Sequence, residues 1–194
     1  MNLDRSYWEN RWVNSETGWD INGPSPAIID LVLNHCKKGD KILFPGAGSA
    51  HDAAFLFNEY GYKNVYICDW AETPLDRFKE QNPKFPKEQV LHANYFELNQ
   101  SFDFIVEQTF FCAIDPTQRS NYALKSSAIL NPNGVLMGLF FNRIFDRKGP
   151  PFGGTKEEYT TLFKDLFQID QLEESQKSIT PRKGYELIFV FRKC

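Results

Sequence analysis

The order of hydrophobic and polar positions indicates short strands that alternate with helices. Apolar, β-rich runs lie at residues 41–44, 64–68, 89–93, 102–106 and 135–141, and helix-compatible stretches separate most of them. Such alternation is typical of βα units that build a parallel sheet. We therefore expect an α/β fold with a mostly parallel sheet.

Beyond Gly154 the pattern changes. A helical stretch covers residues 155–166, and two strand-like runs follow at 167–172 and 185–192. Two such runs joined by a polar segment favour a hairpin. We expect this pair to extend the sheet as a C-terminal antiparallel hairpin at its edge.

Proline marks the start of two helices. Pro24 and Pro26 predict a helix that runs toward Lys38, and Pro116 predicts another that stops before the Asn-Pro-Asn-Gly sequence of residues 131–134. These signals place one helix before the first strand and one between the fourth and fifth strands.

A separate N-terminal segment, residues 7–19, carries Trp8, Arg11 and Trp12 at helical spacing. We expect this segment to form a helical lid on the core. A chain of 194 residues with 42% hydrophobic content suits one compact core. We therefore expect a single domain, residues 1–194, with a helical cap over residues 1–38 and an α/β core over residues 39–194.

Composition excludes several classes of function. The formal net charge is −3, whereas a protein that neutralises phosphates needs a clustered excess of Lys and Arg. The apolar runs are too short to cross a bilayer, and the N-terminus lacks the apolar stretch of a signal peptide. We expect a cytoplasmic monomer that acts on a small molecule, without nucleic acid or membrane as a partner.

The cysteines favour neither a metal site nor a disulfide framework. They are scattered, without a C-x-x-C pair or a histidine at ligand spacing, at Cys36, Cys68, Cys112 and Cys194. We expect free thiols and no metal.

Candidate chemistry begins where the first strand runs into a Gly46-x-Gly48 turn. Glycine lets a ligand approach the main chain beside the N-terminus of the next helix. Asp69 ends the second strand, where a nucleotide-binding sheet accepts hydrogen bonds from a ribose diol. The alternatives are a plain tight turn for the glycines and a helix N-cap for Asp69. His51 takes the place of a third glycine, which disfavours NAD but leaves the adenosine half acceptable.

The third and fourth strands also end in polar and aromatic residues. Asn94 is a candidate for the adenine edge, and Tyr95 or Phe96 for its face. Gln108 follows the fourth strand and is a candidate contact for the methionine part of a cofactor. A strand-end turn with core aromatics is the alternative for this region.

The sequence resembles thiopurine S-methyltransferases and the plant methyl halide and thiol methyltransferases, and the order of its motifs is closer to the second group. The resemblance spans nearly the whole chain, through WENRW (8–12), TGWD (17–20), FPGAG (44–48), DWA (69–71), YFEL (95–98), TFFCAI (109–114), GPPF (149–152) and TPRKG (180–184).

This resemblance implies a Rossmann-like class I methyltransferase that uses S-adenosylmethionine and methylates a small soft nucleophile. Together with the glycine turn, it gives the expected cofactor contacts as Trp8, Trp12, Trp19, Gly46, Gly48, Asp69, Asn94, Tyr95 and Gln108. The plant relatives tend to show Asp-Tyr where this chain has Glu107-Gln108, and relatives carry an acid or Ser in place of Asn94. These departures leave open whether the acceptor is a thiol, bisulfide, thiocyanate, halide, thiopurine, or a selenium or tellurium species.

The tryptophans have a chemical reason to form a lid. An aromatic face attracts the sulfonium cation of S-adenosylmethionine and excludes water, although packing of an amphipathic helix is the alternative. On the substrate side we expect Trp19, Phe111 and Cys112, with Arg182 as the candidate that stabilises a thiolate. The alternatives are a buried free cysteine for Cys112 and a solvated turn charge for Arg182.

Methyl transfer by in-line displacement needs no metal, and a thiolate or halide needs no strong general base. We therefore assign no catalytic residue beyond Arg182, and no catalytic role to any histidine. Two alternative functions stay open at this point: a noncatalytic S-adenosylmethionine-binding protein and an NAD-dependent oxidoreductase.

Overall fold

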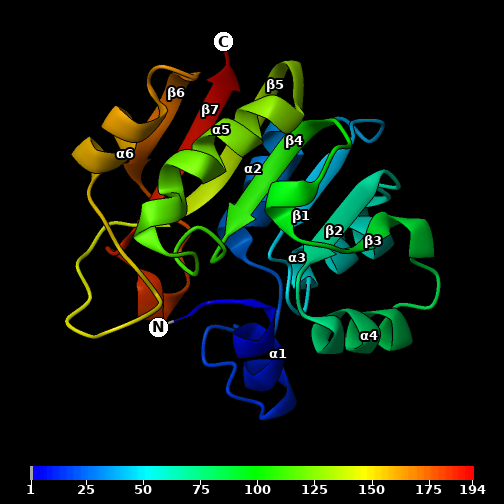
Figure 1. Ribbon diagram of the computed structural model, residues 1–194. Helices are drawn as coiled ribbons and strands as arrows, with labels where there is room; N and C mark the ends of the chain where they lie inside the picture. The colour runs from blue at the N-terminus through cyan, green and yellow to red at the C-terminus, as the bar shows by residue number, and fades with distance from the viewer. Residues whose placement is uncertain (1) are drawn as a thin grey trace.

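The computed structural model describes residues 2–194, in which seven strands form one sheet in the order β3-β2-β1-β4-β5-β7-β6 (Figure 1). Neighbouring strands from β3 to β5 run parallel, and β7 runs antiparallel to both β5 and β6. This confirms the α/β fold with a C-terminal hairpin. The bounds are β1 Ile42–Pro45, β2 Val65–Asp69, β3 Val90–His92, β4 Phe102–Gln108, β5 Leu130–Phe141, β6 Phe167–Glu174 and β7 Glu186–Lys193.

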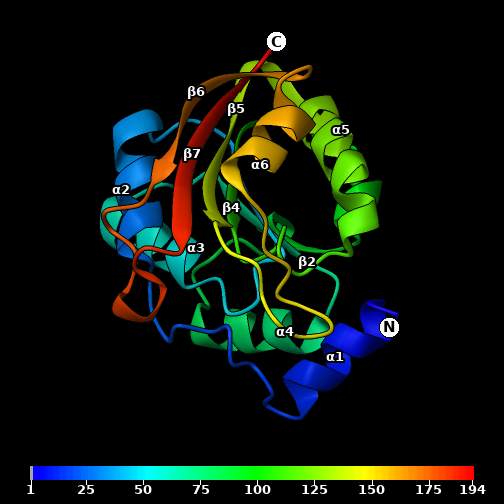
Figure 2. The same cartoon turned by 90° about the vertical axis from the view of Figure 1, so that its left-hand side faces the viewer.

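Helices cover both faces of the sheet (Figures 1 and 2). The helices α2, α3 and α4 contribute buried residues to one apolar layer, and α5 and α6 contribute to the other. Their bounds, with that of the N-terminal helix, are α1 Arg5–Val13, α2 Pro26–His35, α3 His51–Phe55, α4 Glu72–Gln81, α5 Arg119–Ile129 and α6 Lys156–Phe163.

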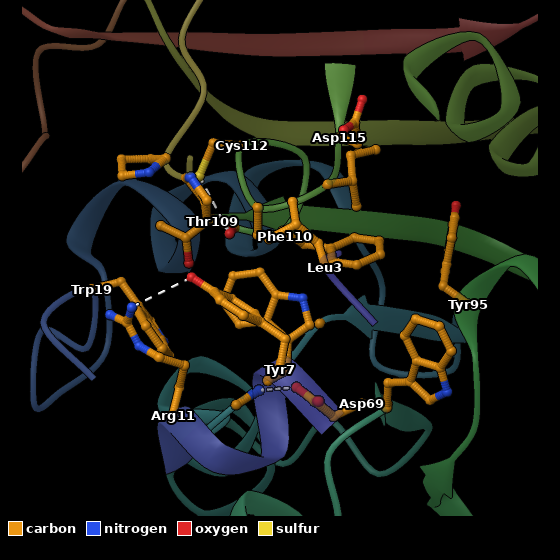
Figure 3. A pocket seen from close by; sticks show the side chains of 18 of the residues that line it. Leu3, Tyr7, Arg11, Trp19, Asp69, Tyr95, Thr109, Phe110, Cys112 and Asp115 are labelled. Carbon is orange, nitrogen blue, oxygen red and sulfur yellow. Dashed lines mark hydrogen bonds between the residues drawn. The ribbon is translucent and has the colours of Figure 1, made fainter. Parts of the chain in front are cut away.

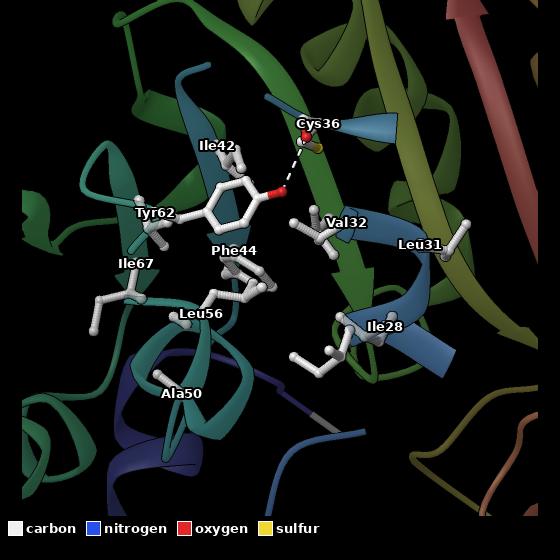
Figure 4. Packing of buried hydrophobic residues seen from close by; sticks show 14 of the residues in the cluster. Ile28, Leu31, Val32, Cys36, Ile42, Phe44, Ala50, Leu56, Tyr62 and Ile67 are labelled. Carbon is white, nitrogen blue, oxygen red and sulfur yellow. Dashed lines mark hydrogen bonds between the residues drawn. The ribbon is translucent and has the colours of Figure 1, made fainter. Parts of the chain in front are cut away.

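Figure 4 shows the first layer, where aliphatic residues of α2 such as Ile28 and Val32 face Ile42 and Phe44 of β1. These side chains are almost completely buried, because strands covered on both faces are apolar along their whole length. Burial of this kind anchors β1, so the turn that follows it has a fixed position.

Local sequence explains the helix starts. Pro26 occupies the first turn of α2, and Asp115 caps a short 3-10 turn, Pro116–Gln118, that leads into α5. In α6, Thr155 and Glu158 form a capping box.

One predicted boundary is wrong. Residues 131–134, expected as a turn after the helix, belong to β5, because Leu130 already pairs with Phe102. The register then shifts, so that Val135 pairs with Phe104. An irregularity in the strand accommodates the Pro and Gly that the sequence pattern presents as a break.

Across residues 2–194, the helices are too short or too polar to traverse a bilayer.

Candidate functional site

A cavity of about 950 Å³ lies at the carboxyl ends of β1, β2 and β4 and extends to the N-terminal segment (Figure 3). This edge is where parallel α/β sheets bind ligands. Of the residues predicted for the site, the cavity is lined by Trp8, Trp12, Trp19, Gly46, Gly48, Asp69, Asn94, Tyr95, Cys112 and Arg182. Segments far apart in the sequence therefore meet around one space.

The glycine turn after β1 forms the floor of the cavity. Gly46 and Gly48 have φ of 55° and 51°, a region that side chains rarely adopt. A Cβ on Gly46 would lie 2.6 Å from Phe110 Cγ, and one on Gly48 would lie 2.7 Å from Trp12 Cζ2. Both glycines are therefore required by the backbone conformation and by aromatic rings that pack directly on the main chain.

Asp69 lies beside this turn at the end of β2. Its Oδ2 accepts a hydrogen bond from the Gly48 amide at 2.8 Å, and its Oδ1 accepts one from the Ala71 amide at 2.9 Å. Burial raises the pKa of this carboxyl group above its ordinary value. A carboxylate has about four acceptor positions, so the ionised group keeps acceptor capacity toward the cavity. The N-cap position of α4 is Ala71, so Asp69 is not the capping residue.

The tryptophans form an aromatic cluster over the glycine turn. The ring centroids of Trp8 and Trp12 lie 5.6 and 5.7 Å from that of Trp19, both in edge-to-face geometry. The Arg11 guanidinium lies 5.4 Å from the Trp19 centroid and donates to the Tyr7 hydroxyl at 3.4 Å (Figure 3). The cavity thus has a wall of rings that carries a cation.

Asn94 and Tyr95 lie on the opposite side, after β3. The Asn94 Oδ1 accepts from the Phe96 amide at 3.1 Å and caps the short 3-10 helix Tyr95–Glu97. The Tyr95 hydroxyl is 2.7 Å from Ser126 Oγ, and its ring centroid is 5.3 Å from that of Phe110. Both the turn and the ligand interpretation hold for this geometry, because both residues also line the cavity.

The structure corrects the position of two predicted residues. Phe111 is 2% exposed and packs in the core against Tyr122 and Phe140, whereas the neighbouring Phe110 lies on the cavity wall. Gln108 lines a smaller adjoining hollow of about 70 Å³. The cause is Thr109, whose φ of 61° turns the chain after β4 and exchanges the directions that strand alternation would give.

Cys112 lies on the cavity wall, and its Sγ donates to the Thr109 carbonyl at 3.3 Å. Burial raises the pKa of this thiol to about 12, so the side chain is protonated at neutral pH. A protonated thiol is a poor nucleophile, and Cys112 therefore contributes to the shape of the wall.

Arg182 is partly buried, with 13% of its side chain exposed. Its Nη2 donates to the Trp19 carbonyl at 2.7 Å, its Nη1 lies 3.5 Å from Glu186 Oε1, and its guanidinium lies 5.6 Å from the Phe141 ring centroid. These contacts exclude the solvated turn charge considered from the sequence. They place a fixed cation at the cavity, bonded to the N-terminal segment.

Sequence reasoning missed Glu107, which is fully buried at the end of β4. Its Oε1 accepts from the amides of Phe110 and Phe111 at 2.8 and 2.9 Å, and its Oε2 accepts from the Tyr122 hydroxyl at 2.8 Å. Burial raises the pKa of Glu107 to about 7. The available signal was an acid at a strand end, as for Asp69. Glu107 holds the turn that directs Phe110 to the cavity.

Comparisons with known proteins give a consistent family. The family model described as Thiopurine S-methyltransferase (TPMT) matches residues 3–191. A "Probable thiol methyltransferase 2" of Arabidopsis thaliana is 28% identical over 192 residues, which cover 96% of this chain and 84% of that protein. "Thiocyanate methyltransferase 1" of Brassica oleracea is 28% identical over 202 residues, covering 98% of this chain and 86% of that protein.

Solved structures share the fold at lower identity. A 1,6-didemethyltoxoflavin-N1-methyltransferase of Burkholderia thailandensis, with bound 1,6-didemethyltoxoflavin and S-adenosylhomocysteine, has a TM-score of 0.77 at 20% identity, covering 97% of this chain and 86% of its own. The CcbJ methyltransferase of Streptomyces caelestis has a TM-score of 0.73 at 14% identity and covers 100% of both chains.

Proposed function

The chain belongs to the thiopurine S-methyltransferase family and is an S-adenosylmethionine-dependent methyltransferase, and we propose that it methylates a small soft nucleophile: a thiol, bisulfide, thiocyanate or halide. The observation that supports this most directly is a buried acid, Asp69, beside a glycine turn and beneath a tryptophan cluster. The family match favours this function over the NAD-dependent oxidoreductase and over a noncatalytic binding protein.

The residues present fit the cofactor. The Asp69 carboxylate has acceptor positions left for ribose hydroxyls, and the cavity of about 950 Å³ is at the upper end of the range for ligand pockets, roughly 300–1,000 Å³. We assign Asn94 and Tyr95 to the adenine, and Trp8, Trp12 and Trp19 to the sulfonium region. Gly46 and Gly48 form the floor, and Gln108 borders it from the adjoining hollow.

S-adenosylmethionine, when bound, supplies a methyl group on a cationic sulfonium. The protein's own residues then have two tasks: to exclude water from the nucleophile and to align it. We assign the first task to Trp19 and Phe110, whose rings line the cavity, with Cys112 shaping the same wall. We assign Arg182 to the second, because its fixed guanidinium favours an anionic acceptor and lowers the pKa of a bound thiol.

The test is formation of S-adenosylhomocysteine by the purified protein with a panel of iodide, bisulfide, thiocyanate and thiophenol. We expect turnover with at least one acceptor, and loss of turnover in Trp19→Ala and Asp69→Ala variants that keep the wild-type melting temperature. Cofactor binding without turnover on the whole panel would instead support the noncatalytic function. Failure to bind S-adenosylmethionine would overturn the cofactor assignment.

We further propose that residues 1–194 act as one methyltransferase domain, that the protein is a cytoplasmic monomer, and that its substrate is a small molecule and not a nucleic acid or membrane. The enclosed cavity and the net charge of −3 support the substrate class. Size-exclusion chromatography with light scattering tests the oligomeric state.

A further inference from the structure

The N-terminal lid, defined here as residues 2–20, covers the cavity and rests on α4 (Figure 2). The lid helix α1 carries Trp8 and Trp12 toward the cavity, and its remaining contacts hold it on the core. These contacts show how the lid is held closed.

The central contact is Glu9 on α1. Its carboxylate accepts a hydrogen bond from the Glu72 amide at 2.6 Å, from the Thr73 amide at 3.3 Å, and from the Thr73 hydroxyl. Burial raises the pKa of Glu9, but these hydrogen bonds and the charge of Arg5 outweigh it, so the net pKa is lowered and the group is ionised at neutral pH.

Glu72 and Thr73 are the first residues of α4, whose amides need acceptors from outside the helix. The residue at the N-cap position is Ala71, and an alanine side chain cannot accept a hydrogen bond. Glu9 therefore performs the capping function for α4 from 63 residues away in the sequence. The negative carboxylate also suits the positive end of the helix dipole.

Two further contacts support the same docking. Arg77 of α4 donates from Nη2 to the Trp12 carbonyl at 3.3 Å, near the end of α1. Arg5 at the start of α1 forms an ion pair with Glu72 at 3.4 Å. The lid helix is thus held on α4 at both ends and at its centre.

The start of α4 directly follows the end of β2. Asp69 accepts from the Ala71 amide on the cavity side, and Glu9 accepts from the next two amides on the lid side. Residues 69–73 are therefore fixed by one carboxylate from the core and one from the lid. Loss of the Glu9 contacts would free both the lid and this segment.

We propose that Glu9 is a positioning residue that docks the lid on the start of α4, so that lid closure and the order of the cofactor-binding segment depend on each other. The consequence for cofactor binding rests on the proposed function, whereas the docking itself does not. Ligands that hold residues 69–71 then stabilise the closed lid, and a closed lid strengthens binding of the ligand.

The tryptophans allow a direct test. The chain has four, and all of them (Trp8, Trp12, Trp19 and Trp70) line the cavity. Quenching of the intrinsic fluorescence by acrylamide in the ligand-free protein therefore reports lid opening, and calorimetry with S-adenosylhomocysteine reports the coupling. The variant is Glu9→Ala, and the matched control is Asn10→Ala, an exposed neighbour on the same helix.

We expect Glu9→Ala to increase the quenching constant above that of Asn10→Ala, and to raise the Kd for S-adenosylhomocysteine about tenfold, or about 1.4 kcal/mol. Glu9→Gln should have an intermediate effect, because the amide oxygen still accepts hydrogen bonds but carries no charge. The kcat at saturating cofactor should change much less than the Kd. Equal quenching and equal Kd in the alanine variant and its control would overturn the proposal.

A second variant separates lid docking from simple helix capping. Adding Ala71→Ser to Glu9→Ala gives α4 a local cap, since the φ and ψ of −79° and 139° at this position are those of an N-cap. We expect this double variant to regain thermal stability but to keep the raised quenching. Recovery of wild-type quenching and Kd would show that Glu9 acts only as a cap and would overturn the proposal. If the wild-type protein fails to bind S-adenosylhomocysteine, the proposed function fails, while the quenching comparison still decides the docking.

Discussion

The glycine turn offers a sharp test of how the cavity is built. In a Gly46→Ala variant the new methyl group would stand 2.6 Å from Phe110 Cγ, so the ring must move. The residue would also keep a φ of 55°, which costs a non-glycine residue roughly 1–2 kcal/mol. The variant therefore combines backbone strain with the loss of an aromatic contact.

The aromatic contribution follows from the neighbours of Phe110. Its ring centroid lies 5.3 Å from that of Tyr95 and 5.9 Å from that of Tyr122, and such pairs contribute about 0.5–1.5 kcal/mol beyond burial. The total loss is then about 2–3 kcal/mol, which corresponds to a melting temperature lowered by roughly 4–12 °C for a domain of this size.

The assay is thermal unfolding of Gly46→Ala against Gly39→Ala, because a methyl group on Gly39 lies in open space and its φ is outside the left-handed region. A double variant, Gly46→Ala with Phe110→Ala, removes the clash, so Gly46→Ala should cost about 1 kcal/mol less in that background. Equal melting temperatures for the two glycine variants, or an unchanged cost in the double variant, would refute the reasoning.

Three further predictions concern single side chains. Asp69→Asn loses charged acceptors for ribose hydroxyls, each contributing about 1.5–3 kcal/mol, so calorimetry should show Kd for S-adenosylhomocysteine raised at least about tenfold, and wild-type affinity would contradict the assignment. Glu107 has a folded pKa of about 7 and an unfolded one of about 4.3. Its stabilising contribution is therefore present below pH ~4 and is lost as the pH rises through 7. Glu107→Gln should flatten the fall of the melting temperature between pH 5 and 8, and an unchanged slope would argue against burial as the cause. Arg182→Gln should lower kcat/KM for thiophenol about tenfold at a pH below its pKa, with a smaller loss once the thiol is fully ionised; a loss that is uniform with pH would assign Arg182 to lid contacts alone.

The fold and the floor of the site were readable because their signals are local. Apolar runs of strand length and the Gly46-x-Gly48 turn depend on residues that are adjacent in the sequence. Asp69 follows from its place at a strand end. The continuation of β5 through residues 131–134 was not readable, because it depends on pairing with Phe102 in another strand.

The residues that sequence reasoning missed depend on distant contacts or on a single dihedral angle. Phe110 and Phe111 are adjacent and chemically identical, and only the positive φ of Thr109 decides which one reaches the cavity. Glu9 lies in a motif recognised for its tryptophans, but its partners are 63 and 64 residues away. Residue type alone gives no sign of such a contact.

The two buried acids near the site use one device at two strand ends. Asp69 after β2 holds the Gly48 amide, over which Trp12 packs, and Glu107 after β4 holds the Phe110 amide, whose ring packs on Gly46. Each carboxylate therefore fixes one half of a contact between a glycine and an aromatic ring. A reaction that needs no strong base depends on exclusion of water and on alignment. In this protein the acids at the site then serve catalysis by fixing the walls in place, and substitutions that loosen either turn should act on rate through geometry more than through proton transfer.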